Sequence, residues 1–305
     1  MDKKVSIYAP KYYREFACVA DKCTHSCCIG WDVYIDERTA KKYGALQSAY
    51  ADKIRESICG GDEPRFRMCA DGRCPHLDER GLCKIIIDSG EGYLCDICRE
   101  HPRFYNESAR GVEVGLGMAC EEAARIILSS DEYGEFVVVG ESEGEIEPTE
   151  LDTIAEIGKI YEILSDSCSY PDRLMRIYSE WEVAPDKLTN GEWRELLSGL
   201  EYLDLDHLKT FAEYSSEVFS HGEMDVLLER ALGYFVYRHC ASARDRSDFR
   251  ASLGVALFLE RLFASVLRHA GVKDLDGATR VARIISEELE YSEENTDIIR
   301  LEFIF

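Results

Sequence analysis

The chain has 305 residues, of which 46% are hydrophobic, so it can bury a sizeable core as one large domain or two ordinary ones, and disorder is excluded. Its formal net charge at pH 7 is −23, from 59 acidic and 36 basic residues. This balance predicts no binding to nucleic acid or to an anionic membrane, because phosphate binding needs clustered Lys and Arg. An acidic surface keeps a protein soluble, and it also suits a cationic partner.

Two features of the sequence bear on its location. No stretch approaches the ~20 uninterrupted apolar residues that a membrane-spanning helix needs. The first residues, MDKKVSIYAPKYY, lack the apolar run of a secretory signal. We therefore expect a cytoplasmic protein without a membrane partner.

Residues 1–120 are rich in Cys, Gly and turn residues, with short extended candidates such as residues 31–36 between loops. A helix is predicted to start near Cys120 and to run through EEAARIIL, because two acidic residues in its first turn favour the positive end of the helix dipole. The run FVVVG at residues 136–140 predicts a strand, and the charged stretch after it predicts a loop.

From Leu151 onward, apolar residues recur at three- and four-residue spacing, which predicts helices. One of them contains LLERALGYFVYRH. Another, SLGVALFLERLFASVLRHAG, is apolar on a broad face and should end near His269, with Gly271 just beyond as a stop. We predict a mostly α fold with a cysteine-rich, metal-binding domain at residues 1–120 that has short strands, followed by a helical bundle at residues 121–305.

Cysteine is the most informative residue type. Of 13 cysteines, eleven fall in the first 120 positions. In a reducing compartment such crowding indicates metal ligation rather than disulfides, and the odd total does not favour a closed disulfide framework. Cys168 and Cys240 lie in helical periodicity and are interpreted as core residues.

The cysteines of the first part form two groups, and neither group alone provides a complete set of metal ligands. Thiolates from two separate stretches can close a zinc site or hold an iron–sulfur cluster, both of which commonly take four cysteines. Adjacent Cys27 and Cys28 rarely bind one ion together, because their side chains diverge. The candidate metal ligands are Cys23, Cys27, Cys28, Cys74, Cys83 and Cys98.

The spacing alone leaves the metal open. The C-x-x-C of Cys95 and Cys98 resembles half a zinc ribbon, but a partner C-x-x-C is missing. The C-x3-C-x2-C spacing of radical enzymes is also absent, because Cys28 follows Cys27 directly. A single one of these cysteines can instead be a buried free thiol, although the clustering argues against this for the whole set. His25 and His76 could be metal ligands or donors to the ligands, but they are interpreted as solvent-facing loop residues.

The cysteine motifs carry a family resemblance. YREFACVADKCTHSCCIGWDVYID at residues 13–36, then CPHLDERGLCKI, YLCDICREHPR and CEEAARIIL, together resemble the FliB family of flagellin lysine-N-methylases. The likeness continues more weakly into ERALGYFVYRH. The second block is also similar to the YkgJ-type iron/zinc-chelating cysteine cluster.

The resemblance implies an enzyme that transfers methyl groups from S-adenosylmethionine to lysine ε-amines of a flagellin-like protein, and that carries a [4Fe-4S] cluster, with zinc as the alternative metal. The residues by themselves identify neither the S-adenosylmethionine pocket nor a catalytic base. A second hypothesis is a non-enzymatic metal-binding module for electron transfer or protein interaction, whose helical half is an interaction domain.

Overall fold

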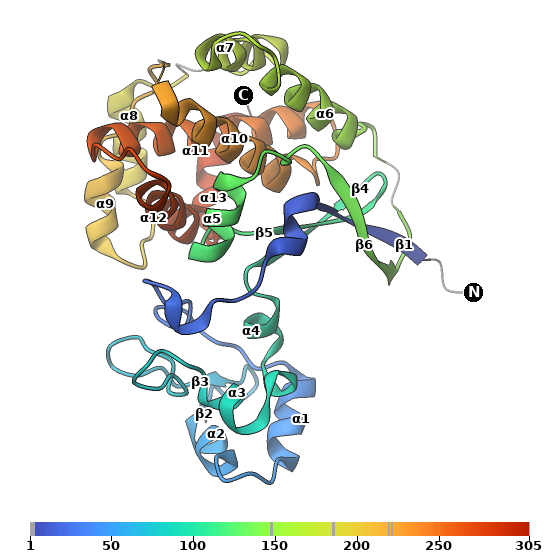
Figure 1. Cartoon of the computed structure of the whole chain (residues 1–305), viewed down its shortest axis with the longest axis vertical. Coiled ribbons are helices and arrows are strands. Elements are labelled where there is room, and N and C mark those ends of the chain that lie inside the picture. Colours follow the sequence, from blue (N-terminus) through green and yellow to red (C-terminus); the bar gives the residue numbers. More distant parts are fainter. Residues whose placement is uncertain (1–3, 147–148, 185–186, 219, 221, 305) are drawn as a thin grey trace. The chain divides into compact units, whose positions relative to one another are not determined.

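The computed structural model describes residues 4–146, 149–184, 187–218, 220 and 222–304 (Figure 1). The chain forms two compact units: a smaller one, Ala17–Pro102, and a larger one made of the residues up to Phe16 and those from Arg103 onward. Helices account for 52% of the chain, so the mostly α fold is confirmed. The domain division at residue 120 stays a prediction; by packing, residues 103–120 group with the larger unit.

The larger unit contains a four-stranded sheet. Its strands are β1 (Lys4–Pro10), β4 (Arg103–Ser108), β5 (Gly111–Leu116) and β6 (Phe136–Glu143), in the order β4-β5-β1-β6. β1 runs parallel to β5 and antiparallel to β6. The strand predicted at residues 136–140 is thus confirmed. Gly115 of β5 lies opposite Phe104 of β4, and a Cβ at Gly115 would be 2.2 Å from that ring, so the glycine makes room for the aromatic side chain.

Helices make up the rest of the larger unit. They are η1 (Lys11–Glu15), α5 (Glu121–Ser129), α6 (Thr153–Leu164), α7 (Tyr170–Glu180), α8 (Asn190–Ser198), α9 (Leu205–Phe211), η4 (Gly222–Met224), α10 (Asp225–Cys240), α11 (Arg246–His269), α12 (Leu275–Ile285), the π-helical segment η5 (Ser286–Glu290) and α13 (Glu293–Leu301). The local sequence explains where a helix such as α8 begins. α8 begins with a capping box in which Thr189 and Glu192 each bond the other's backbone amide.

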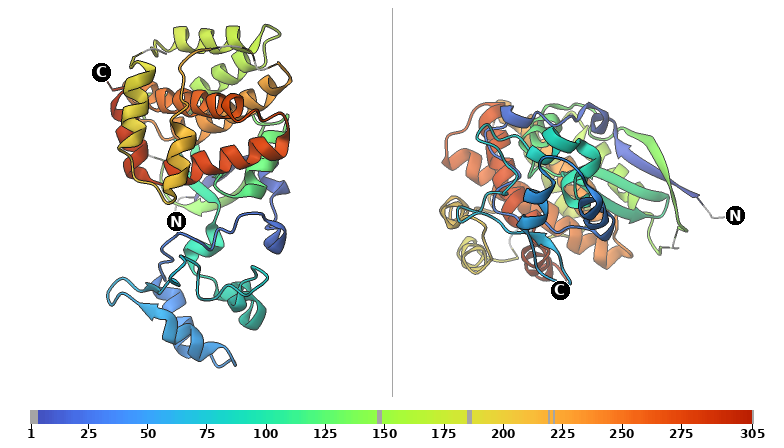
Figure 2. Two further views of the ribbon diagram at one scale, coloured as in Figure 1. Left: turned by 90° about the vertical axis from the view of Figure 1, so that its left-hand side faces the viewer. Right: turned by 90° about the horizontal axis from the view of Figure 1, so that it is seen from below.

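The centre of the larger unit is α11. Nearly all of its side chains from Phe249 to Leu267 are buried, as expected for a helix that is apolar on most of its surface. The helix ends at His269 and Gly271 follows with a φ of +64°, which confirms the predicted stop. α10 and α12 pack against α11, and both also contact α5 (orange, red and green segments in Figures 1 and 2).

The smaller unit consists of short elements. They are η2 (Ala20–Lys22), α1 (Glu37–Ala45), α2 (Ala51–Ser57), β2 (Ile58–Cys59), β3 (Arg65–Phe66), α3 (Lys84–Ser89), η3 (Glu91–Tyr93) and α4 (Asp96–Glu100). The extended candidate at residues 31–36 pairs with residues 64–66 and forms one β-bridge, from Tyr34 to Arg65, but not a full strand. The extended segment ends at Asp36, whose side chain accepts a hydrogen bond from the amide of Thr39 and so caps the start of α1.

The core of the smaller unit is small. Its buried members are Val33, Ile35, Tyr43, Ile54, Phe66, Ile85 and Cys95. Such a core supplies little stability for a unit with so many loops, so a further cross-link is expected. Across the described part of the chain, none of the helices combines the length and apolarity needed to cross a bilayer.

Candidate metal centre

The two cysteine-rich stretches of the smaller unit lie side by side. The amide of Cys74 donates a 2.8 Å hydrogen bond to the carbonyl oxygen of Cys28, and the amide of Gly30 donates one of 3.0 Å to Gly72. Gly30 and Gly72 have φ values of +85° and +76°, which residues with a Cβ rarely adopt, so this pairing of loops depends on glycine. The expected convergence of the two stretches is present.

Two of the later cysteines stand at the N-caps of short helices. Cys83 is the N-cap of α3 and Cys95 is the N-cap of α4. Burial raises the pKa of Cys83, and backbone amides at the start of α3, those of Ile85 and Ile86, donate hydrogen bonds to its sulfur and oppose the rise. Amide donors and a helix N-terminus stabilise a thiolate, which is the form that binds metals.

Five thiols are close enough to influence one another electrostatically: Cys28, Cys74, Cys83, Cys95 and Cys98. Burial raises the pKa of Cys74 to about 12, and the negative charges of Cys28, Cys83 and Cys95 add to the rise. Several thiolates crowded into a partly buried region repel one another, and a bound cation removes that repulsion.

Cys95 and Cys98 shift each other's pKa in opposite directions. The hydrogen bond from the Cys98 thiol lowers the pKa of Cys95, and the same bond, together with burial, raises the pKa of Cys98. The hydroxyl of Tyr43 lies 3.5 Å from the sulfur of Cys95 and donates a 2.7 Å hydrogen bond to the carbonyl of Tyr93. Tyr43 is 1% exposed, so the Cys95 sulfur lies against the core of the unit.

The cysteines of the first group differ in burial, and only Cys28 belongs to the cluster of five thiols. A hydrogen bond with Cys27 lowers the pKa of Cys28 to about 7, against the effect of burial, and the hydroxyl of Ser26 and the charge of Arg73 act in the same direction. Cys27 is exposed and Cys23 is half-buried in the loop after η2. Of the six predicted ligands, the structure therefore places Cys28, Cys74, Cys83 and Cys98 in one cluster; metal ligation by any of the six stays a prediction.

His76 corrects an expectation. It is 1% exposed rather than solvent-facing, and its ring nitrogens Nδ1 and Nε2 lie 3.2 Å from the Tyr50 hydroxyl and 3.0 Å from the Ser57 hydroxyl. Burial lowers its pKa to about 4, so the imidazole is neutral at pH 7. Because both ring nitrogens have hydrogen-bond partners, His76 holds the loop that carries Cys74 in place and is not available as a metal ligand.

Cys95 is the cluster residue that the candidate ligand set omitted. It is 1% exposed and packs in the core of the smaller unit. The signal for it was present in the sequence, because Cys95 and Cys98 form the C-x-x-C pair. Spacing alone did not show that both sulfurs face the same thiols.

The donor set fits a thiolate-bound metal or cluster. All thirteen cysteines lie among the described residues and none forms a disulfide. No group of three or more Cys, His, Asp or Glu side chains in the described ranges is already arranged as a metal-ligand set, so the assignment depends on the clustering of thiols and on their amide donors. Thiolates in this number are the ligands of iron–sulfur clusters and of structural zinc.

Comparisons with known proteins find a flagellar biosynthetic protein and two lysine-N-methylases that resemble this chain. The chain is 29% identical over 135 residues to the flagellar biosynthetic protein FliU of Salmonella muenchen. The matched region covers 42% of this chain and 79% of that protein. It is equally similar, over 135 residues, to proteins named lysine-N-methylase from Salmonella choleraesuis and Salmonella typhimurium. No protein-family model matches the chain, and no solved structure matches it.

The matched region has a limited extent. It covers 33% of each lysine-N-methylase, so the chain spans about a third of the length of those relatives. The likeness to the YkgJ-type cysteine cluster stays a prediction. The similarities to FliU and to the lysine-N-methylases confirm the resemblance that the cysteine motifs indicated.

Proposed function

We propose that the protein is a lysine N-methylase that uses S-adenosylmethionine and modifies a flagellin-like protein. The observation that carries this proposal is the similarity to the two Salmonella proteins named lysine-N-methylase, together with the flagellar name of FliU. The net charge of −23 is consistent with a substrate that presents lysine side chains.

The reaction requires a neutral amine. The lone pair of the lysine Nζ attacks the sulfonium methyl carbon in line, the bond between carbon and sulfur breaks, and its electron pair stays on sulfur to give a thioether. The methylated nitrogen then carries one more proton than the amine product, and that proton leaves to a base or to water. A site for this reaction must bind the lysine ammonium, remove a proton and orient the nitrogen.

We further propose that the thiols of Cys28, Cys74, Cys83, Cys95 and Cys98 provide the ligands of a [4Fe-4S] cluster, with zinc as the alternative. Four of these five suffice for either group. When bound, the metal group supplies a cross-link between the loops of the smaller unit, whose apolar core is small. The remaining cysteine of the five would then pack beside the cluster.

The methylase proposal is tested with full-length protein purified without air. The protein is incubated with flagellin and with S-adenosylmethionine whose methyl group carries ¹³C and deuterium, and mass spectrometry locates labelled methyl groups on lysine. Flagellin with chemically blocked lysines is the control. Calorimetry with S-adenosylmethionine measures binding separately. A protein with its metal bound that neither binds the methyl donor nor labels flagellin contradicts the methylase and leaves the non-enzymatic module.

The metal is tested on the same preparation by elemental analysis and absorption. A [4Fe-4S] cluster gives a brown protein with broad absorption near ~400 nm from sulfur-to-iron charge transfer. Stoichiometric zinc in a colourless protein selects the alternative. Protein that is folded, fully reduced and free of both metals contradicts the proposed centre.

A further inference from the structure

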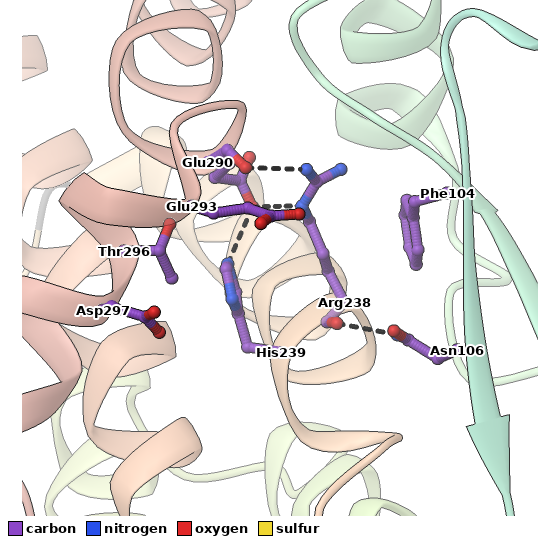
Figure 3. A pocket seen from close by; sticks show the side chains of 8 residues that line it. All are labelled: Phe104, Asn106, Arg238, His239, Glu290, Glu293, Thr296 and Asp297. Carbon is purple, nitrogen blue, oxygen red and sulfur yellow. Dashed lines mark hydrogen bonds and ion pairs between the residues drawn. The ribbon is translucent and has the colours of Figure 1, made fainter. Parts of the chain in front are cut away.

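A cavity of about 280 Å³ lies in the larger unit and is lined by residues of β4, the end of α10, the π-helical segment η5 and α13 (Figure 3). The π-helical turn is an unusual local geometry that is often found at functional sites. Its last residue, Glu290, forms one wall together with Arg238 and His239 of α10. These two residues end the motif ERALGYFVYRH.

Glu290 is buried, and its carboxylate contacts three polar side chains. Its Oε1 lies 3.1 Å from Nε of Arg238 and 2.9 Å from Nε2 of His239, and the hydroxyl of Tyr234 donates a 2.9 Å hydrogen bond to Oε2. Burial by itself would raise the pKa of Glu290, but Arg238 and His239 together hold it below the usual range. The carboxylate is therefore ionised, and it neutralises the guanidinium of Arg238.

The positive charge of Arg238 is also shielded from the cavity on two sides. Its guanidinium lies 4.8 Å from the ring centre of Phe104 and 4.9 Å from that of Tyr291. The Nη2 group donates a 3.1 Å hydrogen bond to the carbonyl of Glu290. Arg238 is thus a fixed part of the wall, and Phe104 adds an apolar surface to the cavity.

Two hydrogen-bond donors that line the cavity bind backbone carbonyls of the protein, and Nη1 of Arg238, which has no hydrogen-bond partner among the described residues, is buried. The amide of Asn106 donates to the carbonyl of Arg238 at 2.8 Å, and the hydroxyl of Thr296 donates to the carbonyl of Leu289 at 2.8 Å. Because the ionised Glu290 can only accept, Nε2 of His239 donates the hydrogen bond between them. The side chain of His239 is only 10% exposed. Acceptors therefore predominate among the groups left for a ligand.

Two carboxylates complete the lining. Glu293 and Asp297 lie one turn apart on α13, both are exposed, and within the described part of the chain neither has a salt-bridge partner. Since Arg238 and Glu290 cancel, these two give the cavity a net negative charge. A ligand that fits is cationic, has several donors and no acceptor, and carries an apolar stem to lie against Phe104. An alkylammonium group has these properties.

We propose that this cavity binds the ε-ammonium and the methylene stem of a lysine side chain of the protein substrate, with Glu293 and Asp297 as its anionic partners. This assignment deepens the proposed lysine N-methylase function and rests on it for the identity of the amine. His239 is held against Glu290 through Nε2 and forms part of the cavity wall.

The test measures binding of a capped lysine peptide and of the same peptide with norleucine, which keeps the stem and removes the charge, to the full-length protein. We expect the lysine peptide to bind and the norleucine peptide to bind at least about tenfold more weakly, because charge-assisted hydrogen bonds are lost. The double variant E293Q/D297N should weaken lysine binding by about tenfold or more. The variant E294Q changes an exposed neighbour on α13 that does not line the cavity, and it should bind as the unmodified protein does.

Each outcome decides the proposal. Equal binding of the two peptides, loss of binding in E294Q as large as in E293Q/D297N, or preference for a capped aspartate peptide would overturn it. Melting temperatures confirm that the exposed substitutions leave the fold intact. Cavity-dependent lysine binding without methyl transfer would retain the site and reject the methylase; methyl transfer that E293Q/D297N leaves unchanged would reject the site and retain the methylase.

Discussion

The amide of Cys74 donates a hydrogen bond of 2.8 Å to the carbonyl oxygen of Cys28, and so joins two cysteine loops that are 46 residues apart in the sequence. Backbone pairing holds these loops together, and the apolar core beneath them is small. Because the loops carry the thiols, folding of the smaller unit and metal binding should be coupled.

Substitution of Cys74 by Ser should remove metal and destabilise the smaller unit, because a hydroxyl is a poor ligand for iron or zinc at neutral pH. Elemental analysis gives the metal content per chain, and limited proteolysis reports unfolding of residues 17–102. Cys69→Ser is the matched control, since Cys69 is exposed and lies in the same loop. A Cys74→Ser protein with full metal content would show that Cys74 is not a ligand.

Cys95→Ser should lower the metal content as strongly as Cys74→Ser does. The reason is structural: the Cys95 sulfur is buried, and its thiol interacts with that of Cys98 in the thiol cluster. Absorption of the anaerobic protein near ~400 nm provides a second measurement. Cys59→Ser, in β2 of the same unit, serves for comparison and should retain its metal. Unchanged metal in Cys95→Ser would exclude Cys95 from the ligand set.

Tyr43→Phe should lower the free energy of unfolding by about 1–2 kcal/mol, because the buried carbonyl of Tyr93 and the Cys95 sulfur lose the hydroxyl. Chemical denaturation measures the change. Tyr34 is 44% exposed, so Tyr34→Phe should be nearly neutral. Equal effects of the two substitutions would show that the Tyr43 hydroxyl contributes nothing specific.

The pair of His207 and Glu288 should make stability depend on pH. Nδ1 of His207 lies 2.5 Å from Oε1 of Glu288, which raises the pKa of His207; Asp204 adds to the rise, whereas burial and Arg283 oppose it. A raised pKa in the folded state means that the stabilisation is complete below the unfolded value of about 6.5 and is lost as the pH rises through the folded value.

His207→Gln should therefore cost more stability near pH 6 than near pH 9, both round values on either side of about 6.5. The free energy of unfolding is measured for the variant and the unmodified protein at both values. His269→Gln is the control, because the His269 side chain is 63% exposed and its contact with Glu213 is screened by water. A cost for His207→Gln that is the same at both pH values would contradict the prediction.

Two glycines in helices should respond in opposite directions to alanine. A Cβ at Gly254 of α11 would lie 2.2 Å from the ring of Phe303, so Gly254→Ala should destabilise by about 1–3 kcal/mol through overpacking. Gly158 of α6 has open space at that position, and Gly158→Ala should stabilise by about 0.5–1 kcal/mol. Thermal unfolding measures both. Stabilisation by Gly254→Ala would show that Phe303 moves aside freely.

Local patterns in the sequence determined much of this protein. The periodicity of apolar residues is sufficient for the helices of the larger unit, including the end of α11 at His269, because a helix buries side chains at a spacing that is visible in the chain. The crowding of cysteines likewise located the candidate metal centre, since metal ligands are chemically distinct residues.

Only the tertiary structure decided which charged and polar groups are buried. Three glutamates of an acid-rich stretch are buried, although charged residues usually face solvent: Glu287, Glu288 and Glu290. Each has a basic partner, which is Arg283 for Glu287, His207 for Glu288 and Arg238 for Glu290. His76 and Cys95 are buried for the same kind of reason. The cost of burying a polar group depends on partners that the fold brings from distant positions, and no local pattern of residues contains that information.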